Sequence, residues 1–215
     1  MKQLLLAVFS IAVAATSFAQ NQDQDPKAKA ILDEISKKTK EYKTISVDFV
    51  TIIKGRDINE TRKGQAIVKG DKFYYESADQ KVFCDGKSVW NYTSEENECY
   101  VEKLSNIDDE LNPSKMLTIW ESGFKFQFVK ETTENGKVIQ EIKLFPKDAQ
   151  KTKYHTIILK IDKAKKEVQK VSIKGKDGLD MTFEIKKFET NKEIPDNTFV
   201  FEKTKFPGVD VIDNR

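Results

Sequence analysis

Apolar and polar residues alternate along most of the chain beyond residue 44, the pattern of strands that bury one face and leave the other in water. The clearest example runs from Val82 to Val101. Two strand-like segments meet there at Asp85-Gly86, a dipeptide suited to a tight turn, and a third begins near Glu98. This stretch predicts an antiparallel meander, which we place at the centre of one large sheet.

Similar alternation predicts strands on both sides of the meander, joined mostly by short hairpins. They cover residues 45–53, 64–69, 73–75, 124–128, 138–145, 154–162, 167–174 and 179–188, with a last strand marked by Phe199 and Phe201. A sheet of about ten or eleven strands cannot stay flat, because right-handed twist makes it curl toward a barrel. We therefore expect an α+β, mainly antiparallel protein whose concave face is apolar.

Two segments have helical rather than strand-like spacing. Asp25-Pro26 is typical of a helix start, and apolar residues then recur at helical spacing through about Tyr42. A second, shorter helix is expected to begin at Asn112-Pro113 and to stop at Gly123. Its wide apolar stripe, an insert between strands that must cover one sheet face, contains Met116, Leu117, Ile119 and Trp120. We expect these helices to roof an apolar hollow.

The first residues are typical of a secretory signal peptide. Lys2 precedes an apolar run from Leu4 to Ala15, and Ser17-Phe18-Ala19 fits a cleavage site after Ala19. The run is too short to span a bilayer comfortably. Residues 20–215 show neither a linker-like change in composition nor an internal repeat, so we expect one exported domain.

Composition narrows the partners and the covalent chemistry. The formal net charge is +2, and removing the one charge of Lys2 leaves +1, which argues against a nucleic-acid partner. Cys84 and Cys99 would be exported to a compartment that favours disulfides. The meander nevertheless separates them by two strand spacings, about 10 Å, so an unbridged pair is favoured over a bridge.

The sequence offers little for catalysis. His155 is the single histidine and lies in an alternating strand, where a surface or packing role is the ordinary one. Nucleophile elbow, metal-binding, nucleotide and dinucleotide motifs are missing from the sequence. We expect a protein that is not an enzyme and needs neither cofactor nor metal. An exported hydrolase that uses two carboxylates remains a weaker alternative.

Three motifs in the same order carry a family resemblance. They are Asp85-Gly86-Lys87-x-x-Trp90-x-Tyr92, Asn112-Pro113-x-x-Met116-Leu117, and Ile194-Pro195-Asp196-x-x-Phe199-x-Phe201 followed by Pro207-Gly208-Val209-Asp210-Val211-Ile212-Asp213. In order and spacing over nearly the whole mature chain, this sequence resembles the LolA family of periplasmic outer-membrane lipoprotein carrier proteins.

The resemblance implies an unclosed, or half, β-barrel with an α-helical lid, located in the periplasm. It also implies acylated lipoproteins as cargo, taken from an inner-membrane ABC-type releasing complex and passed to an outer-membrane acceptor, which is a protein or the membrane. We expect a monomer. Acyl chains need such shielding, because each methylene exposed to water costs about 0.8 kcal/mol.

One position departs from the family pattern. Many members carry an arginine in the strand after the first hairpin that ties lid to barrel, whereas the matching region here is Val68-Lys69-Gly70-Asp71-Lys72. Lid control by that arginine therefore does not transfer, and Lys69 or Lys72 is offered as a substitute.

The predicted lipid-binding residues are apolar residues of the sheet and of the second helix. They are Phe49, Phe73, Tyr75, Trp90, Met116, Leu117, Trp120, Phe126, Ile142 and Leu144. Ordinary packing explains any one of them equally well, so a shared cavity is the deciding observation. The runner-up function is a lipid- or glycolipid-binding sensor or carrier of the same fold.

Overall fold

The computed structural model describes residues 24–107 and 113–215, and within them the chain forms twelve strands. In chain order the strands are β1 (Ile45–Lys54), β2 (Asn59–Lys69), β3 (Lys72–Ser77), β4 (Gln80–Cys84), β5 (Ser88–Thr93), β6 (Glu98–Lys103), β7 (Phe124–Glu134), β8 (Lys137–Pro146), β9 (Tyr154–Asp162), β10 (Glu167–Gly175), β11 (Asp180–Thr190) and β12 (Asp210–Asp213). The predicted signal peptide and Asn112 lie outside the described residues.

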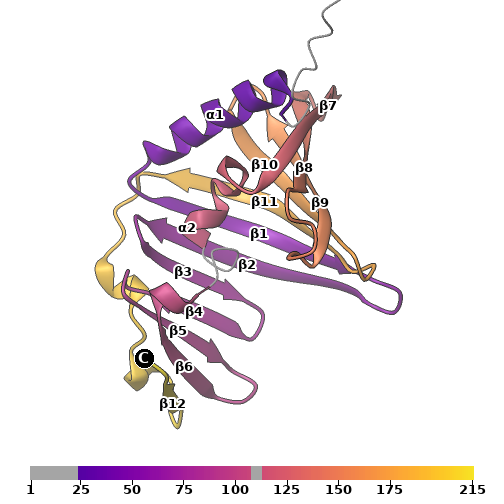
Figure 1. The fold of residues 1–215 in the computed structure, drawn as a ribbon. Coiled ribbons are helices and arrows are strands. Elements are labelled where there is room, and N and C mark those ends of the chain that lie inside the picture. The colour runs from indigo at the N-terminus through magenta and orange to yellow at the C-terminus, as the bar shows by residue number, and fades with distance from the viewer. Residues whose placement is uncertain (1–23, 108–112) are drawn as a thin grey trace, which may run out of the picture.

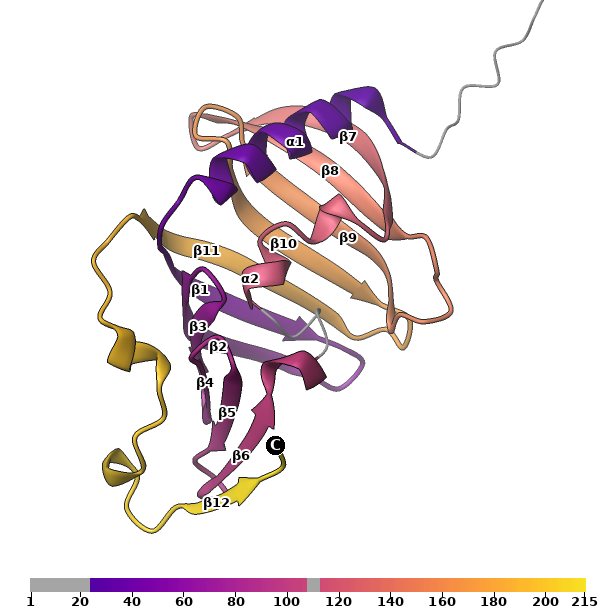
Figure 2. The ribbon, with the colours of Figure 1, turned by 60° about the vertical axis from the view of Figure 1, so that its left-hand side comes forward.

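One α-helix of substantial length and several short helices accompany the strands. They are α1 (Pro26–Lys40), α2 (Pro113–Met116) and the 3-10 helices η1 (Leu104–Asn106), η3 (Ile119–Glu121), η4 (Asp196–Phe199) and η5 (Lys203–Lys205). The second predicted helix is thus a four-residue turn of α-helix followed by a turn of 3-10 helix. Both α1 and α2 lie on the inner side of the curled sheet (Figures 1 and 2).

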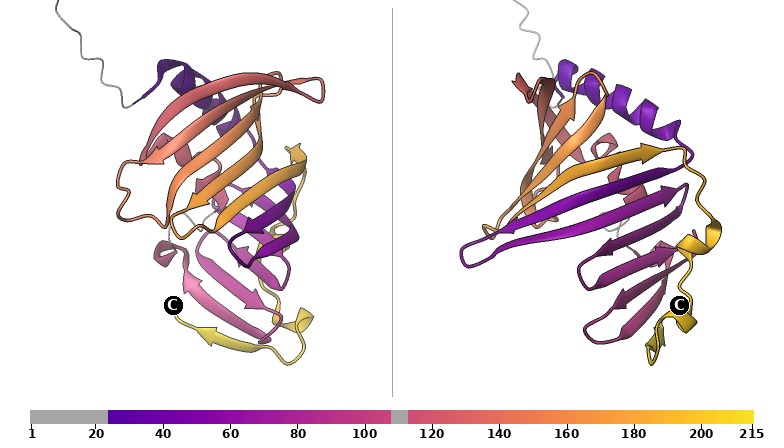
Figure 3. Two further views of the ribbon diagram at one scale, coloured as in Figure 1. Left: turned by 90° about the vertical axis from the view of Figure 1, so that its right-hand side faces the viewer. Right: turned by 180° about the vertical axis from the view of Figure 1, so that it is seen from behind.

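All twelve strands belong to one sheet, in the order β12-β6-β5-β4-β3-β2-β1-β11-β10-β9-β8-β7. Neighbours are antiparallel except β12 and β6, which are parallel. The order ends at β7 and β12, so the sheet curls without closing, as Figure 3 shows from the side and from behind. The expected half-barrel is confirmed.

Two details of the predicted topology are wrong. The meander of β4, β5 and β6 lies near the β12 edge, whereas the middle of the sheet is formed by β2, β1 and β11. Phe199 and Phe201 do not form the last strand. Phe199 ends η4, and the last strand is β12, which pairs with β6 through Asp210 to Asp213.

Strand register divides the sheet into two faces. Phe49 on β1 lies opposite Gly64 on β2 and Ile185 on β11, and Leu117, which follows α2, packs on the same side of the sheet as Phe49 and Ile185. We call this side the concave face. On β3, Phe73 and Tyr75 belong to it, because they pair with Val68 and Ala66 of β2, which in turn lie opposite Ile45 and Val47 on the face of Phe49.

The chain after β11 covers the opposite, convex face of β3 to β6. Phe199 and Phe201 are buried there in an aromatic cluster with Tyr74, Phe83 and Tyr92. The rings of Phe83 and Phe201 lie 5.8 Å apart in an edge-to-face arrangement. On this half of the sheet, the C-terminal segment therefore buries the convex face.

Lys69 and Lys72 hold this C-terminal segment rather than a lid. The Lys69 ammonium donates to the Ile194 carbonyl at 2.9 Å and to Asp196 at 2.8 Å, and Lys72 donates to Asp196 at 2.7 Å. The two lysines hold the pKa of Asp196 down, at about 2. The hypothesis that they replace the family arginine in lid control is not supported by these contacts.

The two cysteines are free and buried on different faces of the sheet. Cys84 packs with Phe73 and Val89 on the concave face, and Cys99 packs in the aromatic cluster on the convex face. Cys84 pairs with Val89 of β5 and Cys99 with Tyr92 of the same strand. A bridge would therefore require the meander to refold.

Gly64 supplies a test of the packing at the middle of the sheet. A Cβ at this position would lie 2.5 Å from Cζ of Phe49 and 2.8 Å from the carbonyl oxygen of Glu76. We expect Gly64→Val to lower the free energy of unfolding by about 1–3 kcal/mol, because the Phe49 ring has to move. Urea denaturation measures this, with Gln65→Val on the opposite face as the control. Equal stability of the two variants would contradict this account of the packing.

Candidate functional site

The concave face of β7 to β10 forms one continuous apolar floor. Its buried members are Phe124, Phe126, Ile142, Leu144, Ile157, Leu159 and Ile161, and α1 contributes Ala28, Leu32 and Ile35 to the same cluster. Helical spacing places these three α1 residues on one side, so the helix lays its apolar stripe on the strands. The cluster therefore joins a fixed floor to a helix that covers it.

Asp25 fastens the start of α1 to the edge strand β7. Its Oδ1 accepts the backbone N–H groups of Lys27 and Ala28, the usual helix cap, while Oδ2 accepts the N–H of Phe128 at 2.9 Å. Gln24 and Phe126 form a parallel β-bridge beside this contact. Burial alone would raise the pKa of Asp25, but these backbone donors outweigh it and lower the pKa below 3.8.

The segment from α2 to η3 connects the β2–β3 turn to α1. At one end, the Ser114 hydroxyl donates to the Gly70 carbonyl at 3.1 Å. At the other end, the buried Trp120 indole N–H donates to Ser36 Oγ at 2.8 Å. We call α1 and this segment together the roof.

Polar contacts also hold the roof together. Lys40 of α1 pairs with Glu121 of η3 at 2.6 Å and lowers the pKa of that carboxylate. Lys38 of α1 donates to the Lys165 carbonyl in the β9–β10 turn at 2.5 Å. Exposed ion pairs of this kind contribute only about 0–1 kcal/mol each, so apolar burial provides most of the attachment.

The structure distributes the predicted lipid-binding residues among several clusters. Trp120, Phe126, Ile142 and Leu144 lie together beneath α1. Phe49, Tyr75 and Leu117 meet at the middle of the sheet, where the Phe49 and Tyr75 rings stack with centroids 5.9 Å apart. Phe73 packs next to them with Cys84 and Val89, and Met116 is 37% exposed on α2.

Trp90 is placed apart from the other predicted residues. It lies opposite Phe83 and Val101 and packs against the aromatic cluster under the C-terminal segment, on the convex face. The reason is the strand period of two, because Val89 and Asn91 take the concave positions of β5. We therefore leave Trp90 out of the proposed lining.

Sequence reasoning missed several residues of the concave face. Phe183 packs edge-to-face on Phe49 with ring centroids 6.0 Å apart, and Ile185 joins the same cluster. Leu159 and Ile161 are almost fully buried in the floor beneath α1. The alternating apolar residues of β9 and β11 were a signal for these positions. To use that signal, one has to know that β11 adjoins β1 and that β9 adjoins β8, and the sequence does not give this order.

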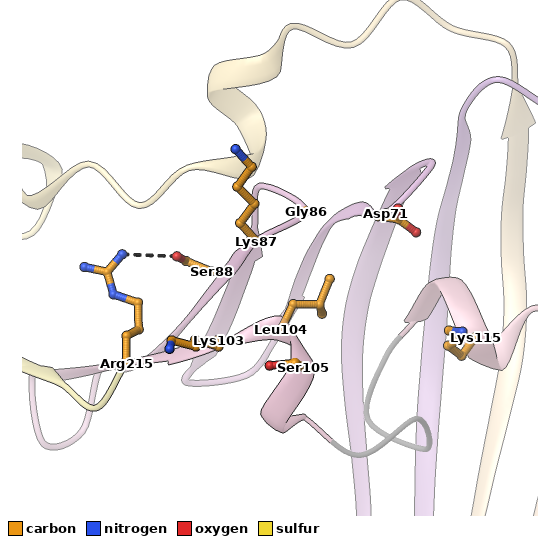
Figure 4. Close-up of a pocket in the computed structure, with 9 residues that line it drawn as sticks. All are labelled: Asp71, Gly86, Lys87, Ser88, Lys103, Leu104, Ser105, Lys115 and Arg215. Carbon is orange, nitrogen blue, oxygen red and sulfur yellow. Dashed lines mark hydrogen bonds between the residues drawn. The ribbon is translucent and has the colours of Figure 1, made fainter.

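Two surface depressions lie on the described part of the molecule. One, of about 670 Å3, lies between the β5–β6 edge and α2, and its lining includes Lys87, Lys103, Lys115, Arg215 and Asp71 (Figure 4). Another, of about 830 Å3, is bordered by both apolar and polar residues of β1 and β2, among them Phe49, Val50 and Lys63. On the concave face, apolar side chains of the roof pack directly on the sheet.

Other chemistries find little support in the described residues. Groups of three or more His, Cys, Asp or Glu side chains able to hold a metal ion were not found there. His155 is exposed, and its Nδ1 lies 2.9 Å from the hydroxyl of the adjacent Thr156. In the same part of the chain, all helices are too short or too polar to cross a bilayer.

Comparison with known proteins identifies the family. The sequence model of the protein family described as outer membrane lipoprotein carrier protein LolA matches residues 40–202, more than half of the chain. The chain belongs to the LolA family. The match spans β1 to η4, and thus includes α2, η3 and eleven of the twelve strands described above.

Individual relatives are distant. The chain is 24% identical to the uncharacterized protein MJ0687 of Methanocaldococcus jannaschii over 93% of its own length, and it spans 58% of that relative. The structure of an uncharacterized conserved protein from Thermus thermophilus has a TM-score of 0.60 at 12% identity, covering 87% of this chain and 99% of that one. A LolA superfamily protein from Nitrosomonas europaea has a TM-score of 0.43 at 11% identity, covering 81% and 97%.

Asp25 allows the attachment of α1 to be tested. We expect Asp25→Ala to cost about 1 kcal/mol of unfolding free energy at pH 7, because it removes the helix cap and the link to β7. The folded pKa is lowered, so this contribution is present above pH 3.8 and lost as the pH falls through the folded value. Urea denaturation at pH 7 and at pH 3 measures the free energy of unfolding of both proteins, and the difference between them should be smaller at pH 3.

Asp25→Asn is the matched control for that experiment. Its amide oxygen keeps the cap to Lys27 and Ala28 but cannot also accept from Phe128. At pH 7 its free energy of unfolding should lie between those of Asp25→Ala and the unsubstituted protein. A loss from Asp25→Ala that does not change with pH would contradict the charged-cap interpretation.

Proposed function

We propose that the protein is a periplasmic carrier that shields the acyl chains of lipoproteins between the inner and the outer membrane. The observation that carries this proposal is the apolar concave face of an unclosed sheet, covered by a roof that belongs to the same chain. Membership of the LolA family, whose model is described as an outer membrane lipoprotein carrier, supports the same function.

Acyl chains would enter between the roof and the concave face and replace the contacts between them. The residues under the roof already exchange apolar contacts with Leu32, Ile35 and Trp120, so hydrocarbon can substitute for them at little net cost. Besides apolar burial, the roof is held by the Asp25 cap, one indole hydrogen bond and a few exposed ion pairs. A binding face that can be uncovered also allows the cargo to be released.

Support for the proposed lining comes from the apolar clusters described above, which contain all of its residues except the exposed Met116. The lining comprises Phe49, Phe73, Tyr75, Met116, Leu117, Trp120, Phe126, Ile142 and Leu144, to which we add Phe183 and Ile185. The proposed donor is an inner-membrane ABC-type releasing complex, and the proposed acceptor is a protein or lipid of the outer membrane. Export with cleavage after Ala19 and a monomeric state complete the proposal.

Leu117 offers a clean test of acyl-chain binding. It belongs to the roof and is half-buried against the Phe49 cluster, so a charged side chain there can turn toward water but opposes hydrocarbon bound beneath it. We expect Leu117→Glu to reduce the amount of co-purifying acylated lipoprotein on the order of tenfold. Mass spectrometry of the purified protein measures the bound acyl species.

Ile58→Glu is the matched control, because Ile58 is 42% exposed in the β1–β2 hairpin and lies away from the roof. It should leave the bound acyl species unchanged. The physiological assay is transfer of a radiolabelled lipoprotein from isolated inner membranes into a soluble complex with this protein. Failure of the unsubstituted protein to extract any lipoprotein would count against the carrier function, and hydrolysis of an ester panel would favour the hydrolase.

A further inference from the structure

One polar atom on the concave face has no hydrogen-bond partner. Thr51 on β1 is 6% exposed, and among the described residues its Oγ1 is the buried side-chain nitrogen or oxygen atom that stays unpaired. A buried hydroxyl without a partner is costly, because it loses its hydrogen bonds to water and gains none in return. Such an atom in an apolar face calls for an explanation, because nearly all buried polar groups in proteins are hydrogen-bonded.

The position of Thr51 is defined by strand register. It is two residues after Phe49, on the same face, and lies directly opposite Phe183 of β11. Phe49 and Phe183 contact each other and belong to the cluster that Leu117 of the roof covers. The hydroxyl therefore stands beside the aromatic floor proposed for acyl chains.

On the side of β2, Thr51 lies next to a pair of charged side chains. It lies opposite Arg62 of β2, whose guanidinium pairs with Glu60 at 2.6 Å, and both of these side chains are exposed. Along one face the environment thus changes from aromatic rings to a single hydroxyl to an ion pair. An amphiphile whose hydrocarbon and charged parts are joined by an ester or amide carries the matching sequence of groups.

We propose that Thr51 is the polar anchor of the acyl site and that its hydroxyl donates to the carbonyl oxygen of the ester or amide that links acyl chain to cargo. The hydrocarbon then lies over Phe49 and Phe183, and the polar part of the ligand leaves past Arg62. This assignment rests on the proposed carrier function and adds to it the recognition of the acyl linkage itself.

The test uses two short-chain lipids that differ only at the linkage. Diheptanoyl phosphatidylcholine has ester carbonyls, and its diheptyl ether analogue has the same chains and headgroup without them. Isothermal titration of the purified protein gives a Kd for each lipid. We expect the unsubstituted protein to prefer the diester by between about twofold and tenfold, the ratio expected of one hydrogen bond.

Thr51→Val replaces the hydroxyl by a methyl group of similar size. The diester should bind to this variant as weakly as the diether, while the diether affinity stays unchanged. Thr51→Ser keeps a hydroxyl and should keep the diester preference. Without ligand, Thr51→Val should be at least as resistant to urea as the unsubstituted protein, because an unpaired hydroxyl has been removed.

Three results would overturn the assignment of Thr51. The first is equal affinity of the unsubstituted protein for the two lipids, and the second is an equal loss of affinity for both lipids in Thr51→Val. The third is a marked loss of stability in unliganded Thr51→Val, which would mean that the hydroxyl has a structural partner. Binding of neither lipid by the unsubstituted protein would instead refute the acyl site as a whole.

Discussion

A curled sheet that does not close must keep the apolar half of its surface out of water, and this constraint governs the whole molecule. The free energy at stake is large, because apolar area contributes about 25 cal/mol per Å2 when it is buried. The chain meets the constraint differently on its two halves. The C-terminal segment covers the convex face of β3 to β6, whereas α1 and the α2–η3 segment cover the concave face of β7 to β11.

These two coverings differ in the way they are secured, which suits a carrier. The C-terminal segment inserts Phe199, Phe201 and Phe206 into an aromatic cluster and is pinned by two lysines on Asp196. The roof contributes an amphipathic stripe, one buried indole hydrogen bond and exposed ion pairs. Under the proposed function, the roof is the covering that exchanges with the acyl chains, and the C-terminal segment is the covering that stays in place.

Much of this architecture was predictable, since hairpins depend on local signals. Alternation and turn dipeptides located eleven of the strands, and Asp25-Pro26 correctly marked the start of α1. The twelfth strand was missed because its four residues are too few to show a period and its parallel pairing with β6 is not local. A period of two also says which residues share a face but not which face is concave, so Trp90 was assigned to the wrong side.

At each edge of the sheet, a segment from near one end of the chain pairs with a longer strand. Residues Gln24 and Asp25 pair with β7 through Phe126 and Phe128, while β12 lies along β6. Free backbone groups on a bare edge strand would recruit another copy, which is the usual route from a sheet to an aggregate. The sheet therefore stays open, while a four-residue edge strand at one end and a bridge from the start of α1 at the other leave fewer backbone groups free to pair with another copy.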